Sequence, residues 1–344
     1  MSRSTGKVLN YTGGSISDIS MNGMRYWFAK YLPNILTIQY PGFTAIENTV
    51  IGIGCLATYD TQYEIVYFTK RDFKAYPNVF LNEETQEFYI KRQSGNIIIE
   101  LGDPNYFENC SWTISYDPKT KMWLSFHDWQ PNHLIGTNDH FYSIKDRGFW
   151  KHNITCSSYC NFYGVNYPFE VEFPVNTGST VNTIKNIEYT LEVLTYPTDC
   201  IDPYNVLNAN FDYAMIYNAE QNSGWLRLNL APQNPTELLK YPIVLTDSVE
   251  IAYSKVENKY RFNQFWDATK DRGQVSGNQF RMFNTEQNGY RKVLNDTYID
   301  YTKSPLQRKR FRHYGNRVIL GKAVSDNLKL NLKVVNTKET LSPR

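Results

Sequence analysis

Residues 112–129 read WTISYDPKTKMWLSFHDW. Trp112, Ile114 and Tyr116 alternate with small polar residues, turn-forming residues follow at 117–121, and a second aromatic run begins at Trp123. Alternation with a period of two is typical of a strand, and a short Asp-Pro-containing segment between two such runs is typical of a tight turn. The stretch therefore predicts two antiparallel strands joined by a hairpin turn.

The same plan recurs at 56–70, 214–230 and 250–266, where apolar alternation ends in a tyrosine, a short polar turn follows, and an aromatic residue comes next. A tight turn brings flanking aromatics across from one another, so cross-strand pairs can stabilise each hairpin. We interpret these aromatics as hairpin anchors. They are Tyr59, Tyr63, Tyr116, Trp123, Tyr217, Trp225, Tyr253 and Tyr260.

Further strand patterns occur at 87–101, at 181–196 and from Arg317 to the end of the chain, whereas helical periodicity is scarce. We therefore predict a mainly β protein of antiparallel hairpin repeats with few short helices. The repeats favour a propeller-like fold with insertions or an inserted β-sandwich. The alternative is that a tyrosine-rich β protein produces such hairpins by chance.

Two helices and two surface loops are also predicted. The helices lie at 18–31, with Asp18 as the N-cap, and at 235–240. The polar stretches 218–224 and 271–289 are typical of surface loops. We place one domain over 1–302 and a basic segment with a β-tail over 303–344.

The composition indicates an ordered globular protein, with 41% hydrophobic and 20% charged residues among 344. It has no apolar run long enough to span a membrane and no signal-peptide pattern at its start. We therefore expect a soluble, unsecreted protein without membrane insertion. The five cysteines are widely spread, so we expect reduced thiols; Cys156 and Cys160 could form a bridge only in an oxidising setting.

Four of the five histidines lie between 127 and 152, in an apparent loop. Their spacings match no common metal-ligand pattern, and neighbours on a strand, such as His127 and Asp128, face apart. The glycines of IGIGC at 51–55 lack the third glycine of a dinucleotide-binding loop, and there is no nucleophile elbow. We therefore predict no catalytic residue, no metal, no cofactor and no enzyme activity.

Residues 303–322 form the clearest charge feature, with seven Lys or Arg residues and no Asp or Glu. The whole chain carries +2, so the rest of it carries −5 once these seven charges are set aside. We predict that Arg308, Arg310, Arg312 and Arg317 contact acidic surfaces of a neighbouring subunit or domain. The alternative is phosphate binding, with nearby aromatic residues stacking on bases.

Four blocks carry a resemblance to a known family. They are VIGIGCLATYDTQYEIVYFTKRDF (50–73), WTISYDPKTKMWLSFHDWQPN (112–132), FYSIKDRGFWKHN (141–153) and SDNLKLNLKVVNTKETLSPR (325–344). In order and content they resemble the C-terminal region of the tail muzzle protein of crAss-like bacteriophages. Members of that family are longer than 344 residues, so we expect a C-terminal portion or a short variant.

The resemblance implies a structural virion protein at the tip of a short phage tail, assembled in the bacterial host cytoplasm. It implies a cyclic homo-oligomer, with a hexamer among the options, that contacts other tail proteins. This assembly would form or line the outlet for DNA ejection and for cargo proteins, which it would touch in passing.

Two other function classes remain open. One is a module of the tail that binds a host-surface glycan or receptor, for which aromatic residues such as Trp129 and Trp150 would stack on sugar rings. The other is an enzyme that degrades the cell envelope, but a glycosidase needs two carboxylates at a defined separation, and the sequence nominates no pair.

Overall fold

The computed structural model of the chain describes most of its residues. It leaves out 46, 155–158, 176–179, 196–202, 208, 229–248, 252, 264, 270–298, 301, 324–326 and 342–344. The described residues divide into two compact units, which we call the N-terminal unit (Met1–Ile154) and the C-terminal unit (the described residues from 159 onward). This division differs from the expected boundary at 302, because strands on both sides of that position share the sheets of the C-terminal unit.

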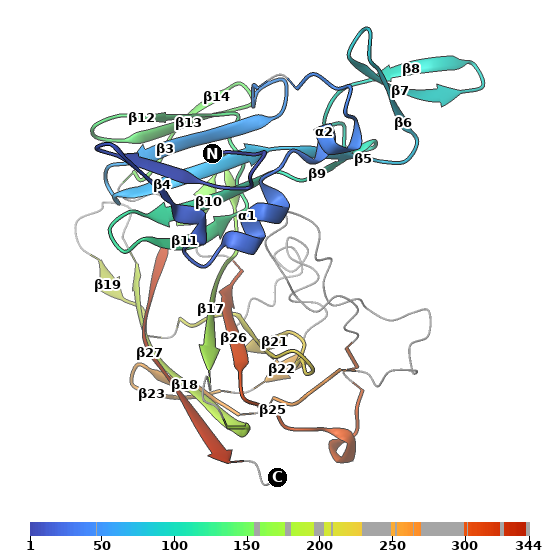
Figure 1. The fold of residues 1–344 in the computed structure, drawn as a ribbon. Helices are drawn as coiled ribbons and strands as arrows, with labels where there is room; N and C mark the ends of the chain where they lie inside the picture. Colours follow the sequence, from blue (N-terminus) through green and yellow to red (C-terminus); the bar gives the residue numbers. More distant parts are fainter. Residues whose placement is uncertain are drawn as a thin grey trace. The chain divides into compact units, whose positions relative to one another are not determined.

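The N-terminal unit is built on a four-stranded antiparallel sheet (Figure 1). Its order is β11 (Met122–His127), β10 (Trp112–Asp117), β4 (Ile65–Arg71) and β3 (Gly54–Asp60). The side chains of Trp112 and Ile114 point from β10 to one face, where they are buried with Phe28 of α1 (Arg25–Tyr31). The alternation seen in the sequence thus provides one apolar face for a helix to cover.

A three-stranded sheet packs against the opposite face of the same four-stranded sheet. It consists of β12 (His133–Gly136), β13 (Phe141–Lys145) and β14 (Gly148–Lys151). Tyr67 of β4 stacks on Phe141 of β13, with ring centroids 5.0 Å apart, and meets Trp129 edge to face at 5.4 Å. Aromatic side chains therefore join the two sheets.

A second core in the same unit gathers short strands around α2 (Ile35–Gln39). The unit begins with a hairpin of β1 (Leu9–Thr12) and β2 (Ser15–Asp18). The strands of the second core are β5 (Phe73–Ala75) paired with β9 (Phe107–Asn109), and β6 (Val79–Asn82), β7 (Glu87–Arg92) and β8 (Gly95–Ile99). Strands β7 and β8 extend away from the four-stranded sheet (Figure 1).

The predicted helix at 18–31 is interrupted. Asp18 caps a single 3-10 turn, η1 (Ile19–Met21), by accepting a hydrogen bond from the Ser20 backbone. The chain then turns at Gly23, whose φ of +83° favours glycine, before α1 begins at Arg25. The sequence prediction missed α2, and the helix predicted at 235–240 lies outside the described residues.

The C-terminal unit is a two-sheet β-sandwich (Figure 1). The first sheet has the order β17 (Phe169–Val175), β26 (Asn316–Lys322), β20 (Tyr213–Tyr217), β21 (Leu226–Leu228) and β22 (Val249–Ile251). The second is centred on β18 (Asn182–Thr195), which pairs with β19 (Tyr204–Asn205), β24 (Lys259–Phe262), β25 (Arg312–His313) and β27 (Leu328–Leu341), while β23 (Ser254–Val256) pairs with β24. A minor hairpin, β15 (Asn161–Phe162) with β16 (Val165–Asn166), and the turn η2 (Pro305–Gln307) complete the unit.

The core of the sandwich lies between its two sheets. Ile187 and Tyr189 point inward from β18 and meet Ile216 of β20 and Leu320 of β26, and all four are buried. The alternation of 181–196 and of the C-terminal tail thus becomes the paired strands β18 and β27. Burial of these alternating apolar side chains is what stabilises the sandwich.

The predicted mainly antiparallel β class is confirmed, and each repeated segment contains an antiparallel strand pair: β3–β4, β10–β11, β20–β21 and β23–β24. The hairpins do not make one propeller blade each, because β3–β4 and β10–β11 belong to the same sheet. The sandwich alternative describes the C-terminal unit.

Two of the four predicted pairs of hairpin anchors are in contact. Tyr116 lies directly opposite Trp123, with ring centroids 4.8 Å apart. Tyr253 contacts Tyr260 at 5.6 Å from a position just before β23.

The other two predicted pairs, Tyr59 with Tyr63 and Tyr217 with Trp225, are wrong. Tyr59 faces Val66, because Tyr63 lies in the turn. Trp225 packs on Tyr213 at 5.2 Å, because the residues after it pair with the start of β20, with Leu226 opposite Ala214. The Tyr217 hydroxyl instead donates to Glu172 on β17.

The prediction of a surface loop at 218–224 is wrong for most of that segment. Asn218, Asn222 and Ser223 are buried, whereas only Ala219 and Glu220 are exposed. Asn218 and Ser223 are hydrogen-bonded inside the protein: Asn218 Nδ2 donates to Asn316 Oδ1 at 2.8 Å, and Ser223 Oγ accepts from the Ile216 backbone at 2.9 Å. Buried polar side chains are tolerated when they are hydrogen-bonded, and sequence polarity alone misses this case. The other predicted loop, 271–289, lies outside the described residues.

Candidate functional site

The basic segment 303–322 is divided between the surface and the core of the C-terminal unit. Its second half forms β26, whose Val318 and Leu320 are buried between the two sheets. Lys322, at the end of β26, makes an ion pair with the buried Asp212 at 2.6 Å. Besides the first half, only Arg317 of β26 is therefore exposed to a partner.

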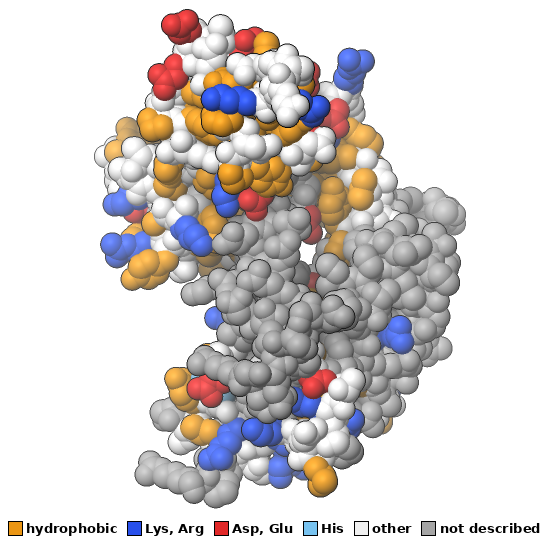
Figure 2. Space-filling model, turned by 90° about the vertical axis from the view of Figure 1, so that its right-hand side faces the viewer, with side chains coloured by type: hydrophobic (Ala, Val, Ile, Leu, Met, Phe, Trp, Pro, Cys, Tyr) orange, Lys and Arg blue, Asp and Glu red, His pale blue; other side chains and the backbone are white. Residues whose placement is uncertain are grey.

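The four arginines of that segment contact separate parts of the C-terminal unit. Arg308 lies over the ring of Trp266 at 4.9 Å, and Arg310 Nη1 donates to the carbonyl oxygen of Asn263 at 3.1 Å. Arg312 is exposed on β25. Arg317 Nη1 lies 2.8 Å from Glu172 Oε1 on the neighbouring strand β17. All four side chains keep exposed surface, so intramolecular contacts leave room for an outside partner. Figure 2 shows Lys and Arg side chains close together over this unit.

Arg317 also belongs to a three-residue cluster. The Tyr217 hydroxyl donates to Glu172 Oε1 at 2.6 Å, the same oxygen that Arg317 contacts. The hydrogen bond to Glu172 raises the pKa of Arg317, and burial followed by the nearby carboxylate raises the pKa of Tyr217. Both groups therefore keep their protons, and the cluster is a fixed charge contact without acid–base chemistry near neutral pH.

The histidine region folds as strands β11 to β14 and their connections, not as the expected loop. His127 Nε2 lies 3.0 Å from Ser115 Oγ, and His152 Nε2 lies 2.6 Å from Ser143 Oγ. Burial lowers the pKa of both imidazoles to about 4. His152 also stacks on Phe141, with centroids 4.2 Å apart.

These two Ser–His pairs lack the access that nucleophilic catalysis requires. Ser115 and Ser143 are 1% and 0% exposed, so a substrate in water cannot reach either hydroxyl. Trp129 covers both imidazoles and is itself 1% exposed, so the prediction that it could stack on a sugar is wrong. The pairs satisfy polar groups within an aromatic core.

The described residues meet neither the requirements of a metal site nor those of a reactive thiol. Across the described residues, no three His, Cys, Asp or Glu side chains gather closely enough to hold a metal ion. Cys55, Cys110 and Cys160 are free, whereas Cys156 and Cys200 lie outside the described residues. Burial raises the pKa of Cys55 to about 11 and that of Cys110 to about 12, so both remain as unreactive thiols.

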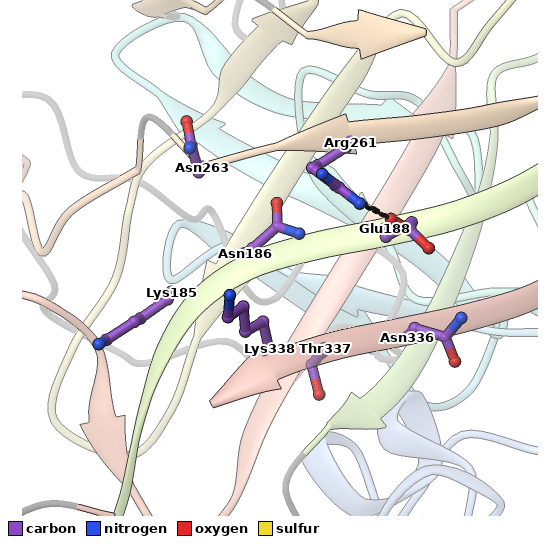
Figure 3. A pocket seen from close by; sticks show the side chains of 8 residues that line it. All are labelled: Lys185, Asn186, Glu188, Arg261, Asn263, Asn336, Thr337 and Lys338. Carbon is purple, nitrogen blue, oxygen red and sulfur yellow. Dashed lines mark hydrogen bonds and ion pairs between the residues drawn. The ribbon is translucent and has the colours of Figure 1, made fainter. Parts of the chain in front are cut away.

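A groove of about 440 Å³ lies on the outward face of β18, β24 and β27 (Figure 3). Its lining is entirely polar: Lys185, Asn186, Glu188, Arg261, Asn263, Asn336, Thr337 and Lys338. The pairing of β18 with β27 shifts register between Ile184 and Asn186, leaving Lys185 as the extra residue of a β-bulge.

The bulge explains how the groove forms. Ile184 and Ile187 are both buried although they are three residues apart, so the two residues between them lie on the outward side. No sequence pattern indicated this groove, because its residues come from strands far apart in the chain. Two successive polar residues, Lys185 and Asn186, interrupt the apolar alternation, and this break could have indicated the bulge.

No protein-family model matches the chain, and a search of curated proteins finds no match either. In the described part of the chain, no helix has both the length and the apolar character needed to span a membrane.

Proposed function

We propose that this protein is a structural, non-enzymatic virion subunit at the tip of a short phage tail, as its resemblance to tail muzzle proteins implies. In this proposal it assembles with copies of itself into a cyclic oligomer and with other tail proteins, around the outlet through which DNA and cargo leave. The observation that carries the proposal is a set of exposed apolar side chains on outer strands of the N-terminal unit.

Three outer strands of that unit carry these side chains. Met122 and Leu124 on β11 are 60% and 52% exposed, Phe149 on β14 is 64% exposed, and Ile98 on β8 is 64% exposed. Each strand is the last of its sheet. Figure 2 shows apolar side chains, in orange, on the visible surface of this unit.

An outer strand presents unpaired backbone groups, and apolar side chains on it invite pairing with another chain. Single-chain proteins normally protect such strands with charges or bulges, whereas subunits of assemblies cover them with a neighbour. Exposed apolar side chains on three outer strands are therefore better explained by a protein that functions inside an assembly. The burial of Ser115 and Ser143 supports the non-enzymatic part of the proposal, because a substrate cannot reach either hydroxyl.

A second candidate function is binding of a host-surface glycan or receptor. Phe149 and Trp150 are 64% and 37% exposed on β14, and exposed aromatic rings can stack on sugars. Trp129 cannot contribute to this candidate function, because it is buried. It predicts that Trp150→Ala abolishes glycan binding while assembly is unchanged.

The test of the assembly proposal is the double variant Met122→Lys/Leu124→Lys. We expect normal circular dichroism, loss of the oligomer in size-exclusion chromatography with light scattering, and loss of incorporation into tail particles. Glu84→Lys is the matched control, because it also adds two units of positive charge, in an exposed turn before β7. An oligomer that forms equally well with both variants would contradict the proposal.

A further inference from the structure

The groove on the outward face of β18, β24 and β27 contains positive charge that the protein does not neutralise. Arg261 Nε donates to Glu188 at 3.0 Å, and this hydrogen bond lowers the pKa of the Glu188 carboxyl group. Lys185 and Lys338 are exposed and have no ion-pair partner among the described residues. An anionic group entering the groove would therefore meet two free ammonium groups, while the groove's only carboxylate is already engaged.

The groove also offers hydrogen-bonding groups that suit a hydroxylated ligand. Asn186, Asn263, Asn336 and Thr337 contribute amides and a hydroxyl to the lining. Asn186 Oδ1 is shielded from water and has no hydrogen-bond partner. A buried acceptor without a donor is unfavourable, and a ligand hydroxyl would supply that donor. Figure 3 shows Asn186 on β18, with Lys338 on the adjacent strand β27.

The same lining argues against nucleic acid. Single-stranded nucleic acid is usually held by aromatic rings that stack on its bases, and no aromatic residue lines this groove. A phosphodiester backbone offers hydrogen-bond acceptors to the lysines, but it offers no hydrogen-bond donor to Asn186 Oδ1. The ligand that satisfies both kinds of group carries a negative charge and several hydroxyls on one small scaffold.

We propose that this groove binds an acidic saccharide, with Lys185 and Lys338 pairing with its anionic group and Asn186 accepting a hydrogen bond from a sugar hydroxyl. The volume of about 440 Å³ lies within the usual range for small-ligand sites. This site is separate from the assembly surface on β8, β11 and β14, so either proposal can fail without the other.

The test uses the full-length chain and a fluorescently labelled oligomer of galacturonic acid in low salt. We expect saturable binding that a neutral maltose oligomer of equal length does not compete for. The variant Lys185→Gln/Lys338→Gln should weaken binding by about tenfold or more, since two charge-assisted contacts are lost. Asn186→Ala should weaken saccharide binding as well, while competition by inorganic phosphate stays unchanged.

The matched control is Lys259→Gln/Lys329→Gln, which removes two exposed lysines from the same sheet but none from the groove lining. Circular dichroism and thermal melting verify that every variant folds. Three results would overturn the proposal: no binding by the wild-type chain, equal weakening in both double variants, or tighter binding of an oligothymidylate than of the acidic saccharide.

Discussion

Lys70 Nζ lies 2.5 Å from Asp72 Oδ2 inside the N-terminal unit, and both side chains are 0% exposed. The ammonium group also donates to the carbonyl oxygens of Tyr31 and Pro33, at 3.0 and 2.8 Å. Asp72 Oδ2 accepts a hydrogen bond from the backbone of Ile35 at 2.7 Å. The pair therefore ties the segment between α1 and α2 to β4, and it is fully hydrogen-bonded on both sides.

Lys70→Met should lower the free energy of unfolding by about 3–5 kcal/mol, because it leaves the Asp72 carboxylate buried without its cation. Chemical denaturation measures this loss. Lys74→Met is the control, since the ion pair of Lys74 with Glu108 is at the surface, and it should change stability by about 0.5 kcal/mol or less. Equal losses in the two variants would show that the buried pair does not stabilise the fold.

The N-terminal unit should lose stability as the pH falls from about 6.5 toward 4. Burial lowers the pKa of His127 and His152 to about 4 in the folded chain, whereas an unfolded histidine titrates near pH 6.5. Between these values the unfolded state binds more protons, so acid favours unfolding, and the effect levels off below the folded pKa.

Urea midpoints recorded between pH 7.5 and 4 test this expectation. His152→Gln should reduce the slope over that range, because it removes one of the two groups. A wild-type midpoint that does not move between pH 6.5 and 4 would refute the mechanism.

Trp123→Ala should destabilise the β10–β11 hairpin strongly. The indole contacts Tyr116 and Phe28 at 4.8 and 4.6 Å, and its Nε1 donates to the Ile19 carbonyl at 3.1 Å. We expect a loss of about 2–4 kcal/mol in the free energy of unfolding. Tyr63→Ala, at the exposed turn of the β3–β4 hairpin, should cost about 0.5 kcal/mol or less. Thermal melting of both variants distinguishes a true anchor from a turn residue.

Arg310→Glu/Arg312→Glu should impair oligomer formation, since both side chains are exposed and the rest of the chain carries net negative charge. Analytical ultracentrifugation measures the effect. Lys259→Glu/Lys329→Glu, with the same change in charge, should assemble normally. If the arginine variant also assembles normally but loses salt-dependent DNA binding, these arginines bind phosphates and do not form a subunit interface.

The sequence alone determined the β class and the strands of the repeated hairpins, but not β12 to β14, whose region it indicated as a loop. The two-residue alternation is a local property, so it predicted β10, β18 and β27 without knowledge of their partners. Where two strands are joined by a short turn, the register follows as well, as it does for Tyr116 opposite Trp123.

Only the tertiary structure decided which strand faces are covered. Alternation divides residues between two faces, but burial depends on what packs there from distant parts of the chain. Trp129 is buried because β13 and the segment after β14 pack on it, and Asn218 is buried because its amide finds Asn316, far along the chain. The groove needs the bulge at Lys185 and the pairing of β18 with β27, so no local pattern could place Lys185 beside Lys338.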